Sequence, residues 1–153
     1  MTGMDNQYGK FLIFTLHDSL YALDLSQVAE VSDPPELWPI PLAPAYYSGV
    51  FSFHGDIVAA IRLSLFLGLD EISEPGKMIV LRQEAASLAF LVDSVFRIVS
   101  EEDVSFTPTP DNAYSARSLI FFDRKATQLD LERVVYRAGI DMQKSRLDSK
   151  MAL

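Results

Sequence analysis

Ser52, His54 and Asp56 are the side chains whose types and spacing come closest to a catalytic set. Residues two apart on a strand share a face, so the Ser52 hydroxyl and the His54 imidazole would lie next to each other. A hydrolase needs such a nucleophile to be activated by a base that a third group holds in place. No elbow motif surrounds Ser52, so we do not expect catalysis. We interpret His54 either as a contact to a partner or as a partly exposed histidine without a task.

The other reactive residues form no recognisable site. His17 lies in a polar turn beside Asp18, and the two histidines do not have the spacing of metal ligands. The chain has no cysteine, which excludes thiol catalysis, disulfides and cysteine-bound metals. The glycines form no nucleotide-binding motif, and the carboxylates are scattered. We therefore predict no catalytic residue, no cofactor and no metal.

Charge and composition narrow the class of partner. The 153 residues carry 13 basic and 21 acidic side chains, a formal charge of −8, which repels nucleic acid and anionic membrane surfaces. With 49% hydrophobic and 22% charged residues, the chain is predicted to be a globular protein with a core. No apolar run approaches the roughly 20 residues of a membrane-spanning helix. The polar stretch Met1–Lys10 has no signal region, so we expect a cytoplasmic protein.

The strongest local signal is a β-hairpin over residues 49–63. Two apolar segments flank Gly55-Asp56, which has the composition of a two-residue type II′ turn. Before it, apolar runs predict strands over 11–16, 20–23 and 28–31, with Val28 and Glu30 on one face of the third strand. Five prolines between Asp33 and Ala45 then predict an extended crossing segment, which Trp38 pins to the body of the protein.

The second half of the chain repeats the first in outline. After an acidic boundary over 70–76, strands are predicted over 78–81, 87–93 and 95–99, and both halves open with two strands that end at Asp24 or Asp93. A loop over 107–112 and a hairpin over 119–129 follow. A helix is predicted from Leu131 to Tyr136, ended or bent by Gly139, with a frayed tail beyond Asp141. About nine short strands predict an all-β barrel or sandwich.

Six motifs along the chain resemble those of the CheW family of chemotaxis coupling proteins, and they follow one another in the order of that family. The hairpin of that family typically reads G-V-x-N-L-R-G-x-V-V-P-V-I-D-L, and here it spans Gly49 to Leu63. The resemblance covers about residues 11–136. The other five motifs are Val28-Ala29-Glu30-Val31, Pro44-Ala45-Tyr46-Tyr47-Ser48-Gly49, Leu63 to Gly68, Val92-Asp93-Ser94-Val95 and Leu129-Asp130-Leu131-Glu132-Arg133-Val134.

The resemblance implies a fold and a function. The fold would be a single domain over residues 1–153, built from two SH3-like five-stranded β-barrels that share a core. The barrels would span about 10–70 and 76–130, with a short C-terminal helix and tail over about 130–153. The function would be that of a non-enzymatic adaptor that couples a chemoreceptor tip to the regulatory domain of a CheA-type histidine kinase. Other CheW-like domains are possible partners, because barrel ends in this family pair in alternation.

The resemblance also assigns partner-binding positions. The strand with Val28 and Glu30 would meet the receptor, and Leu91 would lie near the groove between the barrels. His54 and Arg62 stand where the family usually has arginine and aspartate. At Gly49, the backbone at the entry to the strand requires a glycine. The predicted set is Val28, Glu30, Val31, Gly49, His54, Arg62 and Leu91. The alternative is a barrel that binds a small molecule or peptide, or an enzyme of the same architecture. A pocket with convergent polar groups would favour that alternative, and an apolar patch at a barrel end would favour the adaptor.

Overall fold

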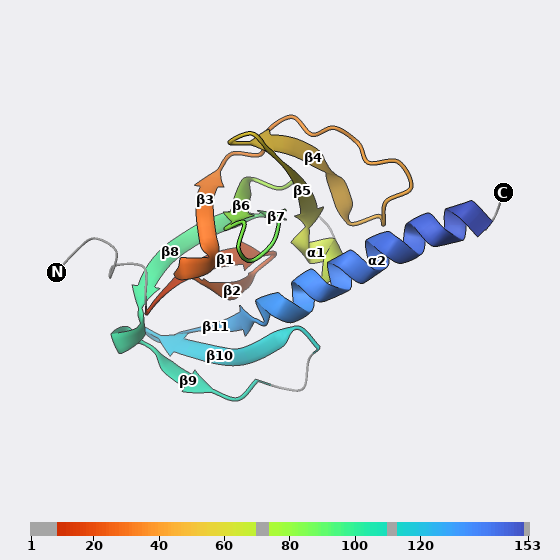
Figure 1. The fold of residues 1–153 in the computed structure, drawn as a ribbon. Helices are drawn as coiled ribbons and strands as arrows, with labels where there is room; N and C mark the ends of the chain where they lie inside the picture. Colours follow the sequence, from red (N-terminus) through yellow and green to blue (C-terminus); the bar gives the residue numbers. More distant parts are fainter. Residues whose placement is uncertain (1–8, 70–73, 110–112, 152–153) are drawn as a thin grey trace.

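Two twisted β-sheets and one long helix make up the protein (Figure 1). The computed structural model describes residues 9–69, 74–109 and 113–151. The six-stranded sheet has the order β8-β1-β2-β11-β10-β9, and the five-stranded sheet has the order β3-β6-β7-β5-β4. This confirms the predicted all-β class with two subdomains, although one sheet has a strand more than predicted.

The elements follow one another along the chain in two similar series. The first series is β1 (Lys10–Leu16), β2 (Ser19–Asp24), the 3₁₀ turn η2 (Leu25–Gln27), β3 (Val28–Ser32), β4 (Tyr47–Phe53), β5 (Asp56–Arg62) and α1 (Leu63–Phe66). The second is β6 (Lys77–Leu81), β7 (Leu88–Val92), β8 (Ser94–Ser100), η3 (Glu101–Asp103), β9 (Ser105–Thr107), β10 (Ser115–Phe121), β11 (Arg124–Leu129) and α2 (Leu131–Met151).

The two sheets do not follow the predicted division of the chain near residues 70–76. The hairpin β1–β2 lies in the sheet of β8, β10 and β11, whereas the hairpin β6–β7 lies in the sheet of β3, β4 and β5. Each half of the chain therefore gives its first hairpin to the other half. The predicted ranges of about 10–70 and 76–130 are corrected accordingly, because strand pairing over long sequence separations cannot be read from local patterns. Of the predicted boundary, residues 70–73 lie outside the described residues.

Asp24 and Asp93 mark the two points where the chain crosses between sheets. Asp24 ends β2, and its Oδ1 accepts hydrogen bonds from the backbone N and the Oγ of Ser26, at 3.0 and 2.7 Å. Asp93 follows β7, and its Oδ2 accepts a 2.7 Å bond from the backbone N of His17. The repeated aspartates noted in the sequence thus hold equivalent crossings of the two halves.

Three clusters of buried side chains form the core. Two of them each belong to one sheet, around Ile13 and Phe121 in the six-stranded sheet and around Phe51 and Val80 in the five-stranded sheet. The third contains residues of both sheets and of α2 and is the shared core. Its buried members are Leu12, Phe14, Leu16, Leu23, Val28, Ile61, Leu63, Ile79, Leu81, Leu88, Phe90, Val92, Leu129, Leu131, Val134 and Ala138.

The turn of the β4–β5 hairpin differs from the prediction. Phe53 pairs with Asp56, so His54 and Gly55 are the two turn residues, and both have positive φ, 49° and 86°. Positive φ at both positions is typical of a type I′ turn, in place of the predicted type II′ turn at Gly55-Asp56. His54 is consequently not on a strand, and the predicted shared face of Ser52 and His54 does not exist.

The proline-rich segment is attached through the backbone of Trp38. Its N and O atoms bond the O and N of Val50 on β4, at 2.9 and 2.8 Å, whereas the Trp38 side chain is 66% exposed. A Cβ on Gly49 would lie 2.6 Å from the carbonyl O of Trp38. Gly49 is therefore required for this close approach, as predicted, while the indole of Trp38 does not pin the segment.

Helix α2 is much longer than the short helix predicted. It continues through Gly139, which is exposed and has no atom within 4 Å of an added Cβ, up to Met151. Two tyrosines beside the five-stranded sheet hold its middle. The Tyr46 hydroxyl donates to Asp141 Oδ2 at 2.7 Å, and the Tyr47 hydroxyl donates to the carbonyl O of Ala138 at 2.8 Å. These contacts outweigh the low helix propensity of glycine, about 1 kcal/mol.

The exchanged hairpins predict how fragments of the chain behave. Residues 1–73 and 74–153, expressed separately, should show neither a cooperative melt nor dispersed amide signals, because each lacks the hairpin that completes its sheet. Mixed in equal amounts, they should recover the circular dichroism and the melt of the intact chain. A cooperative melt of either fragment alone would contradict the exchange.

The tether of α2 predicts a loss of stability at alkaline pH. Burial raises the pKa of Tyr46, and its hydrogen bond to Asp141 raises it further. A raised pKa contributes stability that is complete below the ordinary value near pH 10 and is lost as the pH rises above it. Tyr46→Phe should cost about 1 kcal/mol of unfolding free energy at pH 7 and flatten part of the decline above pH 10. Denaturant melts at both pH values measure this, with the exposed Tyr136→Phe as control.

Candidate protein-docking surfaces

Edge strand β3 carries the residues predicted to meet a receptor, but its faces differ from the prediction. The register shifts between Val28, which pairs with Leu81, and Glu30, which pairs with Val80, so Ala29 forms a bulge. Val28 is 6% exposed and belongs to the shared core. The prediction that Val28 and Glu30 share a partner-facing side is therefore wrong, and the bulge is the physical reason.

Val31 takes the exposed position that was expected for Val28. Val31 pairs with Ile79 of β6, which in turn pairs with Phe90 of β7. Both Ile79 and Phe90 belong to the shared core. Since side chains directly opposite one another share a face, Val31 extends this core row to the edge of the sheet. It is 38% exposed, and Glu30 is exposed on the other face of the strand.

Strand β8 is the counterpart of β3 in the other sheet. The sequence analysis predicts this strand, over residues 95–99, but no partner-binding residue on it. Val95 pairs with Phe14 and Arg97 with Ile13, so Phe96 is bulged as Ala29 is. Ile98 pairs with Leu12 of the shared core and is 51% exposed, as Val31 is on β3. The sequence contains a signal that could have identified these residues, because Val95-Phe96-Arg97-Ile98 repeats the spacing of Val28-Ala29-Glu30-Val31.

Two cation–π pairs hold the exposed phenylalanines near β8. The Arg97 guanidinium lies 5.1 Å from the ring of Phe122, and the Arg124 guanidinium lies 4.8 Å from the ring of Phe96. Both phenylalanines remain partly exposed, at 57% and 39%. We call Glu30, Val31, Phe96 and Ile98 the edge surface, since β3 and β8 are the edges of their sheets (Figure 1).

His54 lies at the tip of the β4–β5 hairpin, next to Ala29 of β3. Its ring packs edge-on against Phe53, with 4.2 Å between ring centroids. Together with Ala29, Val58 and Asp56 it lines a small cavity of about 180 Å³. His54 is exposed, so the structure leaves its side chain accessible to a partner.

Arg62 and Leu91 come together at the opposite end of the five-stranded sheet. They are neighbours in the register of β5 and β7, and both line an open cavity of about 490 Å³ with Tyr47. Arg62 Nη2 lies 3.9 Å from Glu74 Oε2. Leu91 is only 5% exposed. The seven residues of β5 place Arg62 about 20 Å from the His54 turn, so these two positions cannot act as one charged pair.

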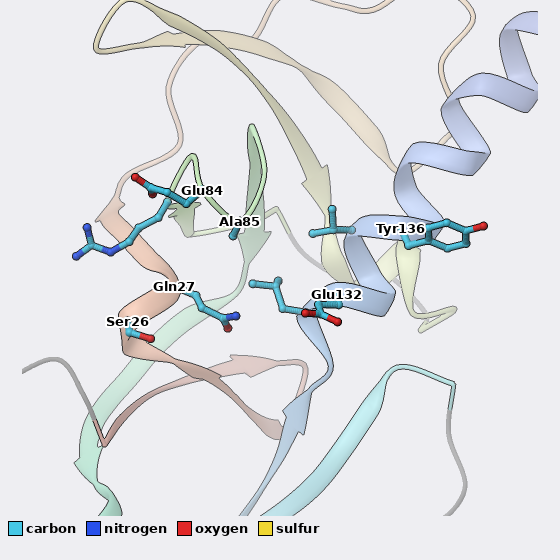
Figure 2. A pocket seen from close by; sticks show the side chains of 9 residues that line it. Ser26, Gln27, Glu84, Ala85, Glu132 and Tyr136 are labelled. Atoms are coloured by element: carbon cyan, nitrogen blue, oxygen red, sulfur yellow. The ribbon is translucent and has the colours of Figure 1, made fainter.

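A groove lies where η2, the β6–β7 loop and the start of α2 meet (Figure 2). Its volume is about 520 Å³, and Leu131 and Val135 supply its apolar lining. The Gln27 side chain points toward Glu132, while Tyr136 points away from the groove (Figure 2). This convergence of one amide and one carboxylate is the place where the ligand-binding alternative would have its site.

The described residues offer neither a cluster for a metal ion nor a membrane-spanning helix. Among them, no group of three or more histidine, cysteine, aspartate or glutamate side chains is arranged to hold a metal ion. In the same part of the chain, no helix combines the length and the apolar character needed to cross a membrane.

Comparisons with known proteins agree on one family. Residues 10–138 match the CheW-like domain. The chain is 31% identical over 112 residues to the chemotaxis protein CheW of Treponema pallidum, an alignment covering 68% of this chain and 65% of that relative. It is 24% identical over 129 residues to the chemotaxis protein CheW of Thermotoga maritima, covering 81% and 85%.

A solved structure has a similar fold. The crystal structure of the scaffolding protein TtCheW from Thermoanaerobacter tengcongensis superposes with a TM-score of 0.74. It covers 83% of this chain and 92% of that chain, at 22% identity. This similarity shows that the two chains share a fold.

Proposed function

The chain belongs to the CheW-like domain family, and from this premise we propose that it is a non-enzymatic adaptor that couples chemoreceptors to a CheA-type histidine kinase. The observation that carries the proposal is the match over residues 10–138, which spans every strand of both sheets and ends in α2. The Treponema relative, of which this chain covers 65%, is a chemotaxis protein, and the structural neighbour is a scaffolding protein. We place the adaptor in the cytoplasm, with no nucleic acid partner and no membrane insertion.

The receptor would bind the edge surface. Val31 and Ile98 present apolar side chains at the margin of the shared core, and Glu30 adds a charge at its border. An apolar centre with a polar rim is typical of protein interfaces. Unpaired strand edges also offer backbone groups, which a folded monomer normally protects. Leu91 and Arg62, which line the open cavity beside Tyr47, are proposed as secondary contacts.

The kinase regulatory domain would bind the hairpin end that carries His54. The family resemblance implies that this domain has the same fold and that barrel ends pair with each other. His54 offers one N–H donor when neutral, whereas the arginine usual at this position offers a planar fork of donors. We therefore expect contact at the usual place with reduced strength.

Substitutions of Val31 and Val28 on β3 distinguish an effect on receptor binding from an effect on folding. A pull-down from the source cells, followed by mass spectrometry, identifies the receptor. Val31→Asp should then weaken binding of its cytoplasmic fragment about 100-fold, because the new carboxylate must be desolvated at an apolar contact. Its melting temperature should change little. Val28→Asp, in contrast, should unfold the protein.

Ile57→Asp is the matched control, because Ile57 is 64% exposed on β5 and lies outside the edge surface. It should leave both binding and melting unchanged. Receptor binding that survives Val31→Asp would move the interface elsewhere, and a pull-down that returns only a small molecule would favour the ligand-binding alternative.

His54 predicts a ranking of kinase affinity among three proteins. An arginine donates through a planar fork of N–H groups, an imidazole through its ring N–H, and an alanine side chain not at all. His54→Arg should therefore raise the affinity, and His54→Ala should lower it. Titration calorimetry against the kinase regulatory domain measures this. Equal affinities of all three proteins would place residue 54 outside the interface.

A further inference from the structure

The open cavity at the end of β5 contains a cation that is largely removed from water. Arg62 is the last residue of β5, and its side chain, which is 23% exposed, lines this cavity of about 490 Å³. The family resemblance gives an aspartate at this position, so the cation is a feature of this chain. A guanidinium presents a planar fork of donors, and the group that matches this fork best is a carboxylate or a phosphate.

Glu74 supplies a carboxylate at the mouth of the cavity. Among the described residues that line the cavity, Arg62 and Glu74 are the charged ones. Arg62 Nη2 lies 3.9 Å from Glu74 Oε2, which is too long for a hydrogen bond, and the Glu74 side chain is 94% exposed. Because such a solvated ion pair contributes little, another carboxylate can displace Glu74 from the guanidinium.

The walls around Arg62 are mainly apolar. They include three prolines and three leucines, which are Pro34, Pro35, Pro75, Leu37, Leu65 and Leu91. A proline has no backbone N–H, so the three prolines add no donor that could compete with the guanidinium for an anion. The hydroxyl of Tyr47, which also lines the cavity, donates to the carbonyl O of Ala138. The lining therefore suits a ligand with one anionic group and an apolar body.

Two of these walls are fixed to each other and to the sheet. One comes from the start of the proline-rich segment, and the other comes from the residues before β6. A 2.7 Å hydrogen bond from Lys77 Nζ to Asp33 Oδ1 joins them. The backbone N of Gly76 donates to the carbonyl O of Val92 at 3.0 Å and so attaches the second wall to β7. A ligand that enters the cavity therefore has to order few groups of the protein.

From this lining we propose that the cavity, which we call the Arg62 cavity, binds a ligand with one carboxylate group and an apolar body. The carboxylate takes the place of Glu74 and accepts two parallel N–H bonds from the guanidinium of Arg62. The apolar body lies against Leu91 and the prolines. A free carboxylic acid and the C-terminal residue of a peptide share this chemistry. The proposal goes beyond the adaptor function and does not rest on it, because it uses only the lining of the cavity.

Butyrate is a suitable probe, since it combines a carboxylate with a short apolar chain. For a ligand of this size we expect a dissociation constant on the order of 1 mM. Each buried methylene increases affinity about fourfold, so butyrate should bind about tenfold more tightly than acetate. Butyramide has nearly the same shape as butyrate but no charge. It should bind at least tenfold more weakly, because it cannot form the charge-assisted pair with Arg62.

NMR titration of the intact, isotopically labelled chain at neutral pH and constant ionic strength tests the proposal. With butyrate, the methyl signals of Leu65 and Leu91 and the side-chain N–H signal of Arg62 should shift and saturate. The methyl signal of Ile98, on the other sheet, should stay unchanged. Acetyl-glycyl-leucine carries the same two groups at a peptide C-terminus, and the tighter of the two ligands identifies the source of the carboxylate.

Substitutions of the two charged residues give the variants. Arg62→Gln should weaken butyrate binding at least tenfold. Glu74→Gln should strengthen it up to about fivefold, because the competing carboxylate is removed. Arg146→Gln is the matched control, since it removes the same charge from an exposed residue of α2, and it should bind butyrate as the wild type does.

Thermal melts by circular dichroism confirm that every variant is folded, and the comparison of butyrate with butyramide needs only the wild type. Wild-type signals that do not saturate with butyrate or with acetyl-glycyl-leucine overturn the proposal, and so does an equal response to butyramide. A folded Arg62→Gln variant that binds butyrate as the wild type does, or a Glu74→Gln variant that binds it more weakly, also overturns it.

Discussion

The exchange of hairpins between the two halves of the chain is the constraint on which the rest of the structure depends. Neither half can complete a sheet, because β1–β2 pair with β8 and β11, and β6–β7 pair with β3 and β5. The side chains between the sheets therefore come from both halves and form one shared core. Helix α2 covers this core with Leu131, Val134 and Ala138, so even the end of the chain is placed by the exchange.

The same constraint determines where partners can bind. With the exchanged hairpins inside the sheets, β3 and β8 remain at edges. Each carries a bulge, and the second residue after the bulge, Val31 or Ile98, lies at the margin of the shared core. Val31 and Ile98 are exposed for this reason, while Val28 and Val95 before them pack inward. The His54 turn is the tip of the β4–β5 hairpin, and it shares a cavity with Ala29 of β3. The two candidate surfaces therefore adjoin each other.

Sequence patterns predicted the local elements well and the long-range ones poorly. The β4–β5 hairpin, the proline-rich crossing and the repeat at Asp24 and Asp93 are local signals, and all appear in the structure. The bulge at Ala29 leaves no mark in the sequence, and the regular alternation that the pattern predicts would place Val28 on the surface. The length of α2 depends on Tyr46 and Asp141, which are 95 residues apart, and no local pattern contains that bond. His54 was placed on a strand because Gly55-Asp56 resembles one turn type while the register selects another.

An NMR footprint of the bound receptor is the measurement that tests the central claim most directly. Methyl and amide signals of the isotopically labelled chain would be recorded while an unlabelled receptor cytoplasmic fragment is added. If the edge surface is the receptor site, signals of Val31, Phe96 and Ile98 shift or broaden together. Shifts confined to the groove around Leu131 and Val135, with none on β3 and β8, would contradict the account.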